Sequence, residues 1–446
     1  MFAQIRDNDS PMQSIDTLIL AMHVIPVAPG GVLNDHAVAI DQGRIVEVLP
    51  SSLALTRYAA KRVVRLERHV LIPGLVNLHC HAAMNLMRGL ADDLPLMTWL
   101  QDHIWPAEGK HVSDEFVHDG SLLAMAEMLR AGATTVNDMY FFPEATARAA
   151  LRAGMRASLG MIVIEFPSAY APDANGYFQK GLATRDAYQG EPLLSFTFAP
   201  HAPYTVGDEA LKRVGVLAEE LDVPIHTHVH ETLGEIEQGQ QQHGVRPLER
   251  LRRLGLVGPR LIAVHAVHLE DAELDLMARE GVSIAHCPSS NLKLASGIAN
   301  IAGARKRGVR VGLGTDGAAS NNRLDPWTEM RTAALLAKAA SGDAAMVSAA
   351  QALEMATLEG ARALGLEREI GSIEVGKAAD LVAVDLSSLE TLPCFDPVSH
   401  LVYAAGREHV SHVWVAGEGR LEDRRLTTID EQDLREKARW WQGKLQ

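Results

Sequence analysis

The period of the apolar positions changes twice along the chain. Residues 16–70 contain short apolar runs such as TLILAMHVIPV, interrupted by Gly, Pro and Asn, which is typical of strands and turns. From Leu71 onwards, short apolar runs alternate with segments of helical spacing such as SDEFVHDGSLLAMAEMLRAG. After residue 369 the chain returns to strand-like runs and ends in a helical segment. The pattern predicts β-rich ends around an α/β centre.

The central part contains eight apolar runs of strand length, each followed by a helical pattern: LIPGLVNL, TTVND, MRASLGMIVI, LLSFTFAP, VPIHTH, RLIAVH, VSIAH and VRVGLGTD. Eight strand–helix units favour a closed (β/α)8 barrel, although an open doubly wound sheet gives a similar alternation. One helix is predicted to begin after the N-cap residue Ser113 and to stop at Gly132, because glycine suits the left-handed position that ends a helix.

The two ends of the chain have similar patterns, and we predict that they fold together as one small β-sandwich domain beside the barrel. The expected boundaries are residues 1–70 for the N-terminal part of this composite domain, 71–369 for the barrel, and 370–446 for the C-terminal part and a tail helix. A chain of 446 residues is long enough for one large and one smaller domain. The overall class is α/β.

Charge and cysteine content narrow the possible partners. Apolar residues make up 47% and charged residues 22% of the chain, which is typical of a globular protein. The formal net charge is −14 and there is no block of Lys and Arg, so no nucleic-acid partner is expected. Cys80, Cys287 and Cys394 are too far apart for a disulfide framework, and no apolar run could span a bilayer. We expect a cytoplasmic protein without a membrane partner.

Histidines and one aspartate stand at the ends of predicted barrel strands. His79 and His81 are two residues apart at the end of the first strand, so both should face the barrel interior. Alone, this pair could equally be two surface histidines in a loop. However, His228, His265 and Asp316 end the fifth, sixth and eighth strands. Because barrels of this type build their active sites at the C-terminal ends of the strands, the pattern predicts a metal site there.

These motifs resemble the amidohydrolase superfamily, and within it the methylthioadenosine/S-adenosylhomocysteine deaminases and triazine hydrolases. The resemblance covers nearly the whole chain and rests on PGLVNLHCHAAMNLMRGLADDL, APHAPYT, HTHVHET, AVHAVHL, AHCPSSNLKLASG, GLGTDGAASNN and GSIEVGKAADLVAVD. It implies one divalent metal per subunit, zinc with iron(II) as the alternative, held by His79, His81, His228 and Asp316. Pro200 and His201 stand where binuclear relatives carry a bridging lysine, which favours a single ion.

The resemblance also implies roles for the residues around the metal. A bound divalent ion lowers the pKa of a coordinated water from about 16 toward 7 and so supplies a nucleophile. Asp316 would take a proton from this water, and His265 would orient it and stabilise developing charge. Glu231, three residues after His228, resembles the proton shuttle to a ring nitrogen. It could instead be a solvated carboxylate at the start of a helix.

Two further residues resemble substrate contacts. Glu108, in WPAEGK, matches the glutamate that binds the ribose diol in nucleoside-acting relatives, since an ionised carboxylate accepts from both hydroxyls. His201, in APHAPYT, resembles another contact. Glu108 could instead be an exposed loop acid, and His201 a group behind the ligands. No arginine follows the third strand, where relatives often bind the sugar or its 5′ group; an apolar 5′ group could pack against Met84, Met161 or Trp99.

The expected function is zinc-dependent hydrolytic deamination of an adenosine-type purine nucleoside (5′-methylthioadenosine, S-adenosylhomocysteine or adenosine) by a homo-oligomer. The alternative is deamination of guanine, 8-oxoguanine, a pterin or a triazine at the same metal site, in which case replacing Glu108 would be nearly silent. An inactive barrel kept as a scaffold is disfavoured, because all ligands and the acid are present. The long loop Met84 to Lys110 follows a ligand strand and is predicted to cover the site.

Overall fold

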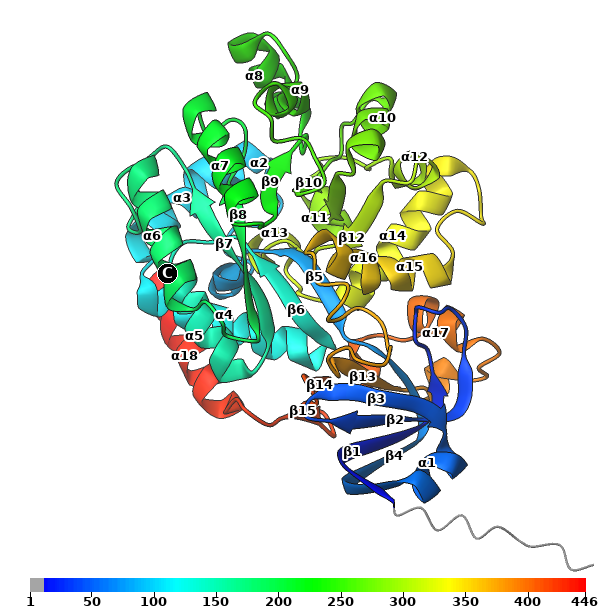
Figure 1. The fold of residues 1–446 in the computed structure, drawn as a ribbon. Helices are drawn as coiled ribbons and strands as arrows, with labels where there is room; N and C mark the ends of the chain where they lie inside the picture. Colours follow the sequence, from blue (N-terminus) through cyan, green and yellow to red (C-terminus); the bar gives the residue numbers. More distant parts are fainter. Residues whose placement is uncertain (1–11) are drawn as a thin grey trace, which may run out of the picture.

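The computed structural model describes residues 12–446, which form a barrel and a second sheet (Figure 1). The barrel strands are parallel and follow the chain order β5 (Leu75–Cys80), β6 (Ala133–Asp138), β7 (Arg156–Val163), β8 (Leu194–Pro200), β9 (Ile225–Val229), β10 (Leu261–His265), β11 (Ser283–His286) and β12 (Arg310–Leu313). The amides of Thr315 and Asp316 donate to the His79 carbonyl oxygen at 3.1 and 3.0 Å, so the two edges of this sheet nearly close. Each predicted run overlaps one barrel strand, although the first run, LIPGLVNL, begins in β4 (Tyr58–Pro73) of the second sheet, and the barrel prediction is confirmed.

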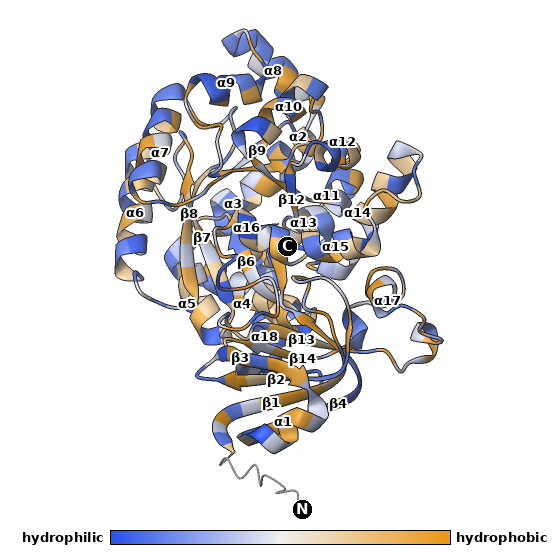
Figure 2. Ribbon diagram, turned by 45° about the vertical axis from the view of Figure 1, so that its right-hand side comes forward, coloured by the Kyte–Doolittle hydropathy of each residue, from blue (hydrophilic) through white to orange (hydrophobic). Residues whose placement is uncertain are grey.

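Helices surround the barrel strands. They are α4 (Asp114–Arg130), α5 (Pro143–Ala153), α6 (Ala174–Ala187), α7 (Asp208–Glu220), α8 (Leu233–His243), α9 (Pro247–Arg253), α10 (Asp271–Glu280), α11 (Pro288–Lys293), α12 (Ile301–Lys306), α13 (Ala318–Asn321), α14 (Pro326–Ser341), α15 (Ala349–Met355) and α16 (Leu358–Ala363). Figure 2 shows hydrophilic residues along the outer helices and mainly hydrophobic ones in the strands. None of the helices within residues 12–446 combines the length and hydropathy needed to cross a membrane.

Helix α4 shows how local sequence sets an element's ends. The Ser113 hydroxyl accepts from the Phe116 amide at 3.2 Å, which satisfies one of the free donors of the first turn. The helix ends at Arg130, and Gly132 has a φ of 84°, in the region that favours glycine. The predicted N-cap and the predicted glycine stop are both found in the structure.

Both ends of the chain contribute to the second sheet, which lies below the barrel in Figure 1. Its strands run in the order β16 (Arg425–Leu426), β15 (Glu418–Glu422), β14 (Val410–Val415), β13 (Leu381–Asp385), β4 (Tyr58–Pro73), β1 (Gln13–Val24), β2 (Leu33–Asp41) and β3 (Arg44–Pro50). Strand β4 is parallel to β1 and antiparallel to β13, so the two ends meet in the middle of the sheet. The remaining elements in these parts are α1 (Ser51–Arg57), η3 (Leu389–Thr391), α17 (Pro397–Tyr403) and η4 (Arg407–His409).

A composite terminal sheet is therefore present, while the domain boundaries at residues 70 and 370 stay predictions. Residues 1–11 of the predicted N-terminal part lie outside the described residues. Strand β4 runs on to Pro73, and Gly74 connects it directly to barrel strand β5. A Cβ atom at Gly74 would lie 2.0 Å from Thr134 Oγ1, so this close junction requires glycine.

The tail helix α18 (Glu431–Leu445) packs against the barrel rather than against the terminal sheet. Its Trp441 ring lies edge-on to Phe116 of α4, with the centroids 5.1 Å apart. Trp441 Nε1 donates to Asp119 Oδ2 at 3.2 Å, and Lys437 Nζ donates to Asp119 Oδ1 at 2.8 Å. The last residues of the chain thus cover a barrel helix, as Figure 1 also shows.

A buried ion pair joins the barrel to the terminal sheet. Arg156, at the start of β7, donates from Nε and Nη2 to the two carboxylate oxygens of Asp380 at 3.1 and 3.2 Å. The Arg156 side chain is only 9% exposed and the Asp380 side chain only 1%. The Ala416 amide also donates to Asp380 at 2.8 Å, and Arg156 Nη1 donates to the Pro192 carbonyl oxygen at 3.0 Å. Both charges are therefore held by further polar partners, which a buried pair needs.

We expect Asp380→Asn to lower the free energy of unfolding by about 3 to 5 kcal/mol, because it leaves the Arg156 guanidinium buried without its counter-ion. The lower free energy of unfolding should appear as a lower midpoint temperature of thermal unfolding. Glu209→Gln is the matched control, since Glu209 pairs with Lys212 on the surface of α7 and its side chain is 90% exposed. Equal midpoints for Asp380→Asn and Glu209→Gln would show that the buried pair does not stabilise the junction.

Candidate metal centre and active site

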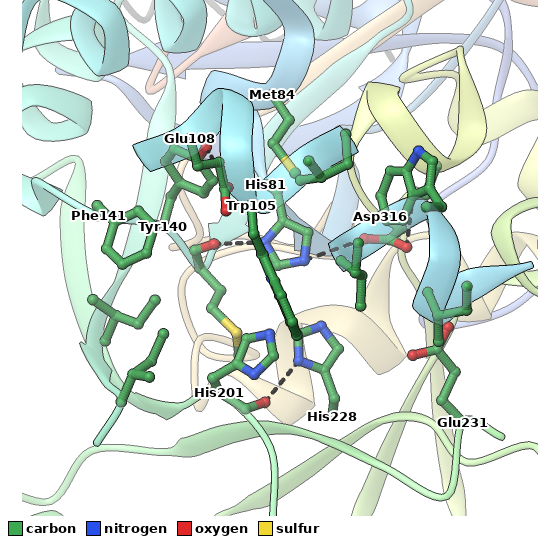
Figure 3. A pocket seen from close by; sticks show the side chains of 18 of the residues that line it. His81, Met84, Trp105, Glu108, Tyr140, Phe141, His201, His228, Glu231 and Asp316 are labelled. Atoms are coloured by element: carbon green, nitrogen blue, oxygen red, sulfur yellow. Dashed lines mark hydrogen bonds and ion pairs between the residues drawn. The ribbon is translucent and has the colours of Figure 1, made fainter. Parts of the chain in front are cut away.

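The four predicted metal ligands meet at the C-terminal ends of the barrel strands. His79 and His81 come from β5 and the residue after it, His228 from β9, and Asp316 from the turn after β12. Asp316 Oδ1 lies 3.3 Å from Nε2 of both His79 and His81, and His228 Nε2 lies 3.3 Å from His79 Nε2. Figure 3 shows His81, His228 and Asp316 pointing toward one another. The structure thus brings together four residues that are far apart in the sequence.

The opposite ring nitrogens of these histidines fix their orientation. His81 Nδ1 donates to the Met139 carbonyl oxygen at 2.6 Å, and His228 Nδ1 donates to the His201 carbonyl oxygen at 2.7 Å. A ring nitrogen that meets a carbonyl oxygen carries the proton, so Nε2 of each ring is left with its lone pair toward the centre. Neutral imidazoles converging with one carboxylate form a donor set that fits a divalent metal such as zinc or iron(II).

Behind His79 lies a further histidine. His79 Nδ1 is 2.9 Å from Nε2 of His226, which the two-residue period of β9 places on the same inward face as His228. Burial lowers the pKa of His79 to about 3, and burial also holds the pKa of His226 well below its usual range. Both rings are therefore neutral, which suits His79 as a ligand and His226 as its support.

Asp316 is held by three donors in addition to the histidines. The Gly317 amide donates to Oδ1 at 2.7 Å, while the hydroxyls of Ser290 and Ser320 donate to Oδ2 at 2.6 and 2.8 Å. Burial disfavours the charged form, but the contact with His79 and the surrounding imidazoles hold the pKa of Asp316 well below its usual range. Asp316 is consequently an ionised carboxylate with a fixed orientation.

Glu231 and His265 lie beside the ligands. His265 Nε2 is 3.8 Å from Glu231 Oε2, and His265 Nδ1 is 2.8 Å from Asn291 Oδ1. The Ser296 hydroxyl donates to Glu231 Oε1 at 3.3 Å. Glu231 is only 7% exposed, so it is not the solvated carboxylate of the alternative interpretation. Burial raises its pKa above the ordinary value, which favours a protonated acid that can give up a proton.

The segment predicted to cover the site lines one wall of the pocket, but it is helical rather than a loop. It consists of η1 (Ala82–Met87), α2 (Leu96–Thr98), the π-helical turn η2 (Trp99–Ile104) and α3 (Trp105–His111). Glu108 lies on α3, where the Tyr140 hydroxyl donates to its Oε1 at 2.7 Å. Burial raises the pKa of Glu108 to about 7, although the Tyr140 hydrogen bond favours the ionised form. Glu108 faces the pocket and is not an exposed loop acid.

His201 follows β8 and lies next to the ligands. Its carbonyl oxygen accepts from His228, as described above, and its side chain lines the pocket (Figure 3). His201 Nδ1 is 3.0 Å from Thr205 Oγ1. Burial lowers the pKa of the ring to about 3, so His201 is neutral. The backbone of His201 therefore supports the ligand His228, while its ring faces the pocket, where it could contact a substrate.

The apolar wall of the pocket was predicted only in part. Met84 and Trp99 line it, but Met161 does not, because its side chain faces α6 on the outside of β7. The alternation along that strand places Ile162 and Ile164 on the pocket side instead. Sequence analysis also missed several other lining residues, namely Leu96, Leu100, Ile104, Trp105, Met139, Tyr140, Phe141, Phe166, Tyr204, Leu294 and Ser320.

The family follows from the fold, the donor set and a match to known sequences. The profile of the amidohydrolase family matches residues 70–419. The chain belongs to the amidohydrolase family. It is similar to a protein of Teredinibacter turnerae that is named 5-methylthioadenosine/S-adenosylhomocysteine deaminase, with 46% identity over 433 residues that cover 97% of this chain and 98% of that protein.

Two solved structures show the same fold. An adenosine deaminase from Xanthomonas campestris with bound zinc is 51% identical and superimposes with a TM-score of 0.96 over 98% of this chain and 99% of that chain. Atrazine chlorohydrolase from Arthrobacter aurescens, complexed with zinc, is 25% identical. It superimposes with a TM-score of 0.88 over 95% of this chain and 99% of that chain. These similarities confirm the predicted family, barrel and enzyme class, a metal-dependent hydrolytic deaminase, and they support a divalent metal at the donor set.

Proposed function

We propose that the chain hydrolyses the 6-amino group of adenosine-type nucleosides (5′-methylthioadenosine, S-adenosylhomocysteine and adenosine) to give the inosine analogue and ammonia, with one Zn²⁺ per subunit. One observation carries the proposal. His81, His228 and Asp316 of the donor set line one largely apolar pocket together with a buried acid, Glu231, and with Glu108, and the fourth donor, His79, lies directly beside them. Figure 3 shows Glu108 and Glu231 on opposite sides of this pocket. Similar proteins are named 5-methylthioadenosine/S-adenosylhomocysteine deaminase and adenosine deaminase, which supports the same substrate class.

The four ligands would hold the zinc ion, which supplies a water acidic enough to act as a nucleophile at neutral pH. Asp316 is ionised and positioned to accept a proton from that water. His265, held by Asn291, lies between Glu231 and the ligands and would orient the water by a hydrogen bond. One water molecule is consumed, the C6–N bond breaks, and the oxygen stays on the ring carbon.

Glu231 would supply the proton that the ring needs during attack. Its protonated carboxyl donates to the ring nitrogen next to C6, which prevents negative charge from building up on the purine. The Glu231 carboxylate would then pass the proton of the added hydroxyl group to the departing amino group, so that ammonia leaves and the ring carbon keeps a carbonyl oxygen. The proton that Asp316 took from the water would restore the Glu231 acid. The pocket around Glu231 is buried and apolar, and this burial raises the pKa of the carboxyl, which favours the protonated form that the step needs.

Glu108 would bind the ribose. Its carboxylate lies across the pocket from Glu231, with one oxygen occupied by the Tyr140 hydroxyl. The remaining lone pairs can accept from the vicinal 2′ and 3′ hydroxyls of a nucleoside. A free base has no such diol, so this contact separates nucleosides from guanine, 8-oxoguanine, pterins and triazines.

The KM for a nucleoside should rise as the pH falls below about 7. Burial raises the pKa of Glu108 to about 7, so below that pH the carboxyl is protonated and loses acceptor capacity, whereas above it the ionised form binds both hydroxyls. The rise should approach tenfold per pH unit well below the pKa. Steady-state kinetics between pH 6 and 8.5 would measure it.

Glu108→Gln is the control for this pH effect, because glutamine does not titrate and its KM profile should be flat. Tyr140→Phe removes the hydrogen bond that favours the ionised carboxylate, so the rise in KM should begin at a higher pH. If Glu108→Gln keeps the wild-type pH profile, another group governs nucleoside binding.

The direct test of the proposal is ammonia release and loss of adenine absorbance by the zinc-loaded enzyme. The substrates are methylthioadenosine, S-adenosylhomocysteine, adenosine, guanine and 8-oxoguanine. We expect turnover of at least one adenosine and none of the free bases. Activity on a free base alone would keep the metal chemistry and overturn the nucleoside assignment. One equivalent of zinc per chain, measured by elemental analysis, would support the single-ion site.

We further propose that the enzyme is a cytoplasmic homo-oligomer. All three cysteines are free in the structure, which fits a reducing compartment. Light scattering on the purified protein would give the oligomeric state, and a monomeric mass would overturn that part of the proposal.

A further inference from the structure

Away from the metal centre, the ionisable side chains that line the pocket are acids. Among residues 12–446, the pocket lining includes Glu108, Glu231 and Asp316 but no lysine and no arginine. Its histidines are the zinc ligands or their immediate neighbours. A substrate group with a negative charge therefore finds no lysine or arginine among the described residues of this wall, and His265, whose pKa Glu231 and Asp316 raise despite its burial, lies at the metal centre.

The wall beside Glu108 is aromatic and aliphatic. Trp105 precedes Glu108 by three residues on α3, so both side chains lie on the same side of that helix. The Trp105 ring packs 6.5 Å from that of Phe166, which follows β7. Leu100 and Ile104 complete this wall from the preceding turn. A group attached to a ribose that is bound by Glu108 therefore meets apolar surface first.

A second cavity adjoins this wall on the outside. Trp105, Phe166 and Tyr204 line both the pocket and the outer cavity. The outer cavity contains Glu165, which is exposed, and Arg250, which is only 5% exposed. A long substrate tail that passes the aromatic wall would enter this cavity.

Arg250 is not free to bind a ligand anion. Its Nε donates to Asp208 Oδ1 at 2.8 Å, its Nη2 donates to the Val206 carbonyl oxygen at 3.0 Å, and its Nη1 donates to the Pro203 carbonyl oxygen. Glu165 adds a negative charge to the same cavity. Within residues 12–446, neither space thus offers a lysine or arginine that is free to bind a carboxylate, and burial lowers the pKa of His243, the one histidine of the outer cavity.

We propose that this pocket selects adenosine nucleosides with a short, uncharged 5′ substituent, such as methylthio or hydroxyl, and disfavours a 5′ amino-acid tail. The proposal rests on the proposed function and narrows its substrate class. The tail of S-adenosylhomocysteine carries an α-ammonium and an α-carboxylate; Glu165 could pair with the ammonium, but the carboxylate would meet no lysine or arginine of the described chain that is free to bind it. Methylthioadenosine places an apolar methylthio group against Trp105, Phe166 and the neighbouring aliphatic side chains, where burial is favourable.

The kcat/KM for methylthioadenosine should exceed that for S-adenosylhomocysteine by at least tenfold in the wild-type enzyme, since a charge-assisted hydrogen bond to the carboxylate is missing. Ammonia release measured side by side on both nucleosides tests this. Equal kcat/KM values would overturn the proposal. If neither nucleoside nor adenosine is turned over, the proposed function itself fails, which is a different result.

Phe166→Arg tests the cause of the selectivity. Phe166 is 41% exposed and lies on the wall shared by both cavities, so the substitution should be tolerated and should place a guanidinium where the tail passes. We expect the ratio of kcat/KM for S-adenosylhomocysteine to that for methylthioadenosine to rise at least tenfold. Phe166→Gln is the matched control, polar but uncharged, and should raise this ratio far less. Equal ratios in the two variants would overturn the role of charge.

Discussion

Glu231→Gln is expected to lower kcat by about 100- to 10,000-fold while the enzyme keeps its full metal content. Glutamine has the same size as glutamate and can still accept the hydrogen bond from Ser296, so the pocket should be undisturbed. It cannot release a proton to a ring nitrogen, however, and the purine would have to accept negative charge during attack. Steady-state rates on methylthioadenosine measure kcat, and elemental analysis measures the metal content.

Glu237→Gln provides the control for this experiment. Glu237 lies six residues further on in α8 and is exposed, so its replacement should change neither kcat nor metal content. Turnover near the wild-type rate in Glu231→Gln would remove Glu231 from the role of proton donor. Loss of metal together with rate would instead indicate that Glu231 supports the donor set.

His228→Ala should lose bound metal and activity together. His228 is one of three imidazoles in the donor set, and the His201 carbonyl oxygen holds it with Nε2 toward the centre. A site with two histidines and one carboxylate binds zinc far more weakly. Without the ion the water is not acidified, so we expect kcat/KM to fall by at least about 1000-fold.

His36→Ala is a suitable control, because His36 lies on β2 of the terminal sheet, away from the metal centre and from both cavities. Its replacement should leave zinc content and rate unchanged. A His228→Ala protein that still binds one equivalent of zinc would contradict the proposed ligand set.

The barrel and the positions of its ligands could be predicted from the sequence because they depend on short-range patterns. Most of the strands are short, largely apolar runs, and parallel strands in a barrel end on the same rim. His79, His228 and Asp316 therefore had to lie near one another once eight strands were assigned. Glu231 was identified differently, because a glutamate three residues after a ligand histidine resembles the proton shuttle of the family.

The pocket wall was harder to predict because it depends on the segment after β5. Residues 82–111 form four short helical pieces, one of them a π-helical turn, so no single apolar period runs through them. Trp105 and Ile104 could not be assigned to the pocket without knowing how these pieces pack. Met161 was assigned to the wrong side of β7, because its neighbours Ile162 and Ile164 are also apolar and hide the alternation.

The backbone at the metal centre was also beyond sequence reasoning. His265 and Asp316 adopt left-handed backbone conformations, with φ of 67° and 61°. Sequence patterns favour glycine at such positions, because side chains with a Cβ are strained there. Such strained positions occur at functional sites, where the surrounding structure holds them in place. In this protein they turn two reactive side chains toward the centre at the ends of their strands.

The pairing of β4 with β13 also has a consequence for how the enzyme is made. While the ribosome is still adding barrel residues, β4 has already been synthesised, yet the strand that will cover its open side has not. An uncovered strand edge pairs readily with other chains, and here it continues through Gly74 into the strand that carries His79. A chain released before β13 should therefore aggregate rather than act as a smaller hydrolase. The yield of active enzyme would therefore depend on how many chains are translated through β13, as well as on the supply of the metal ion.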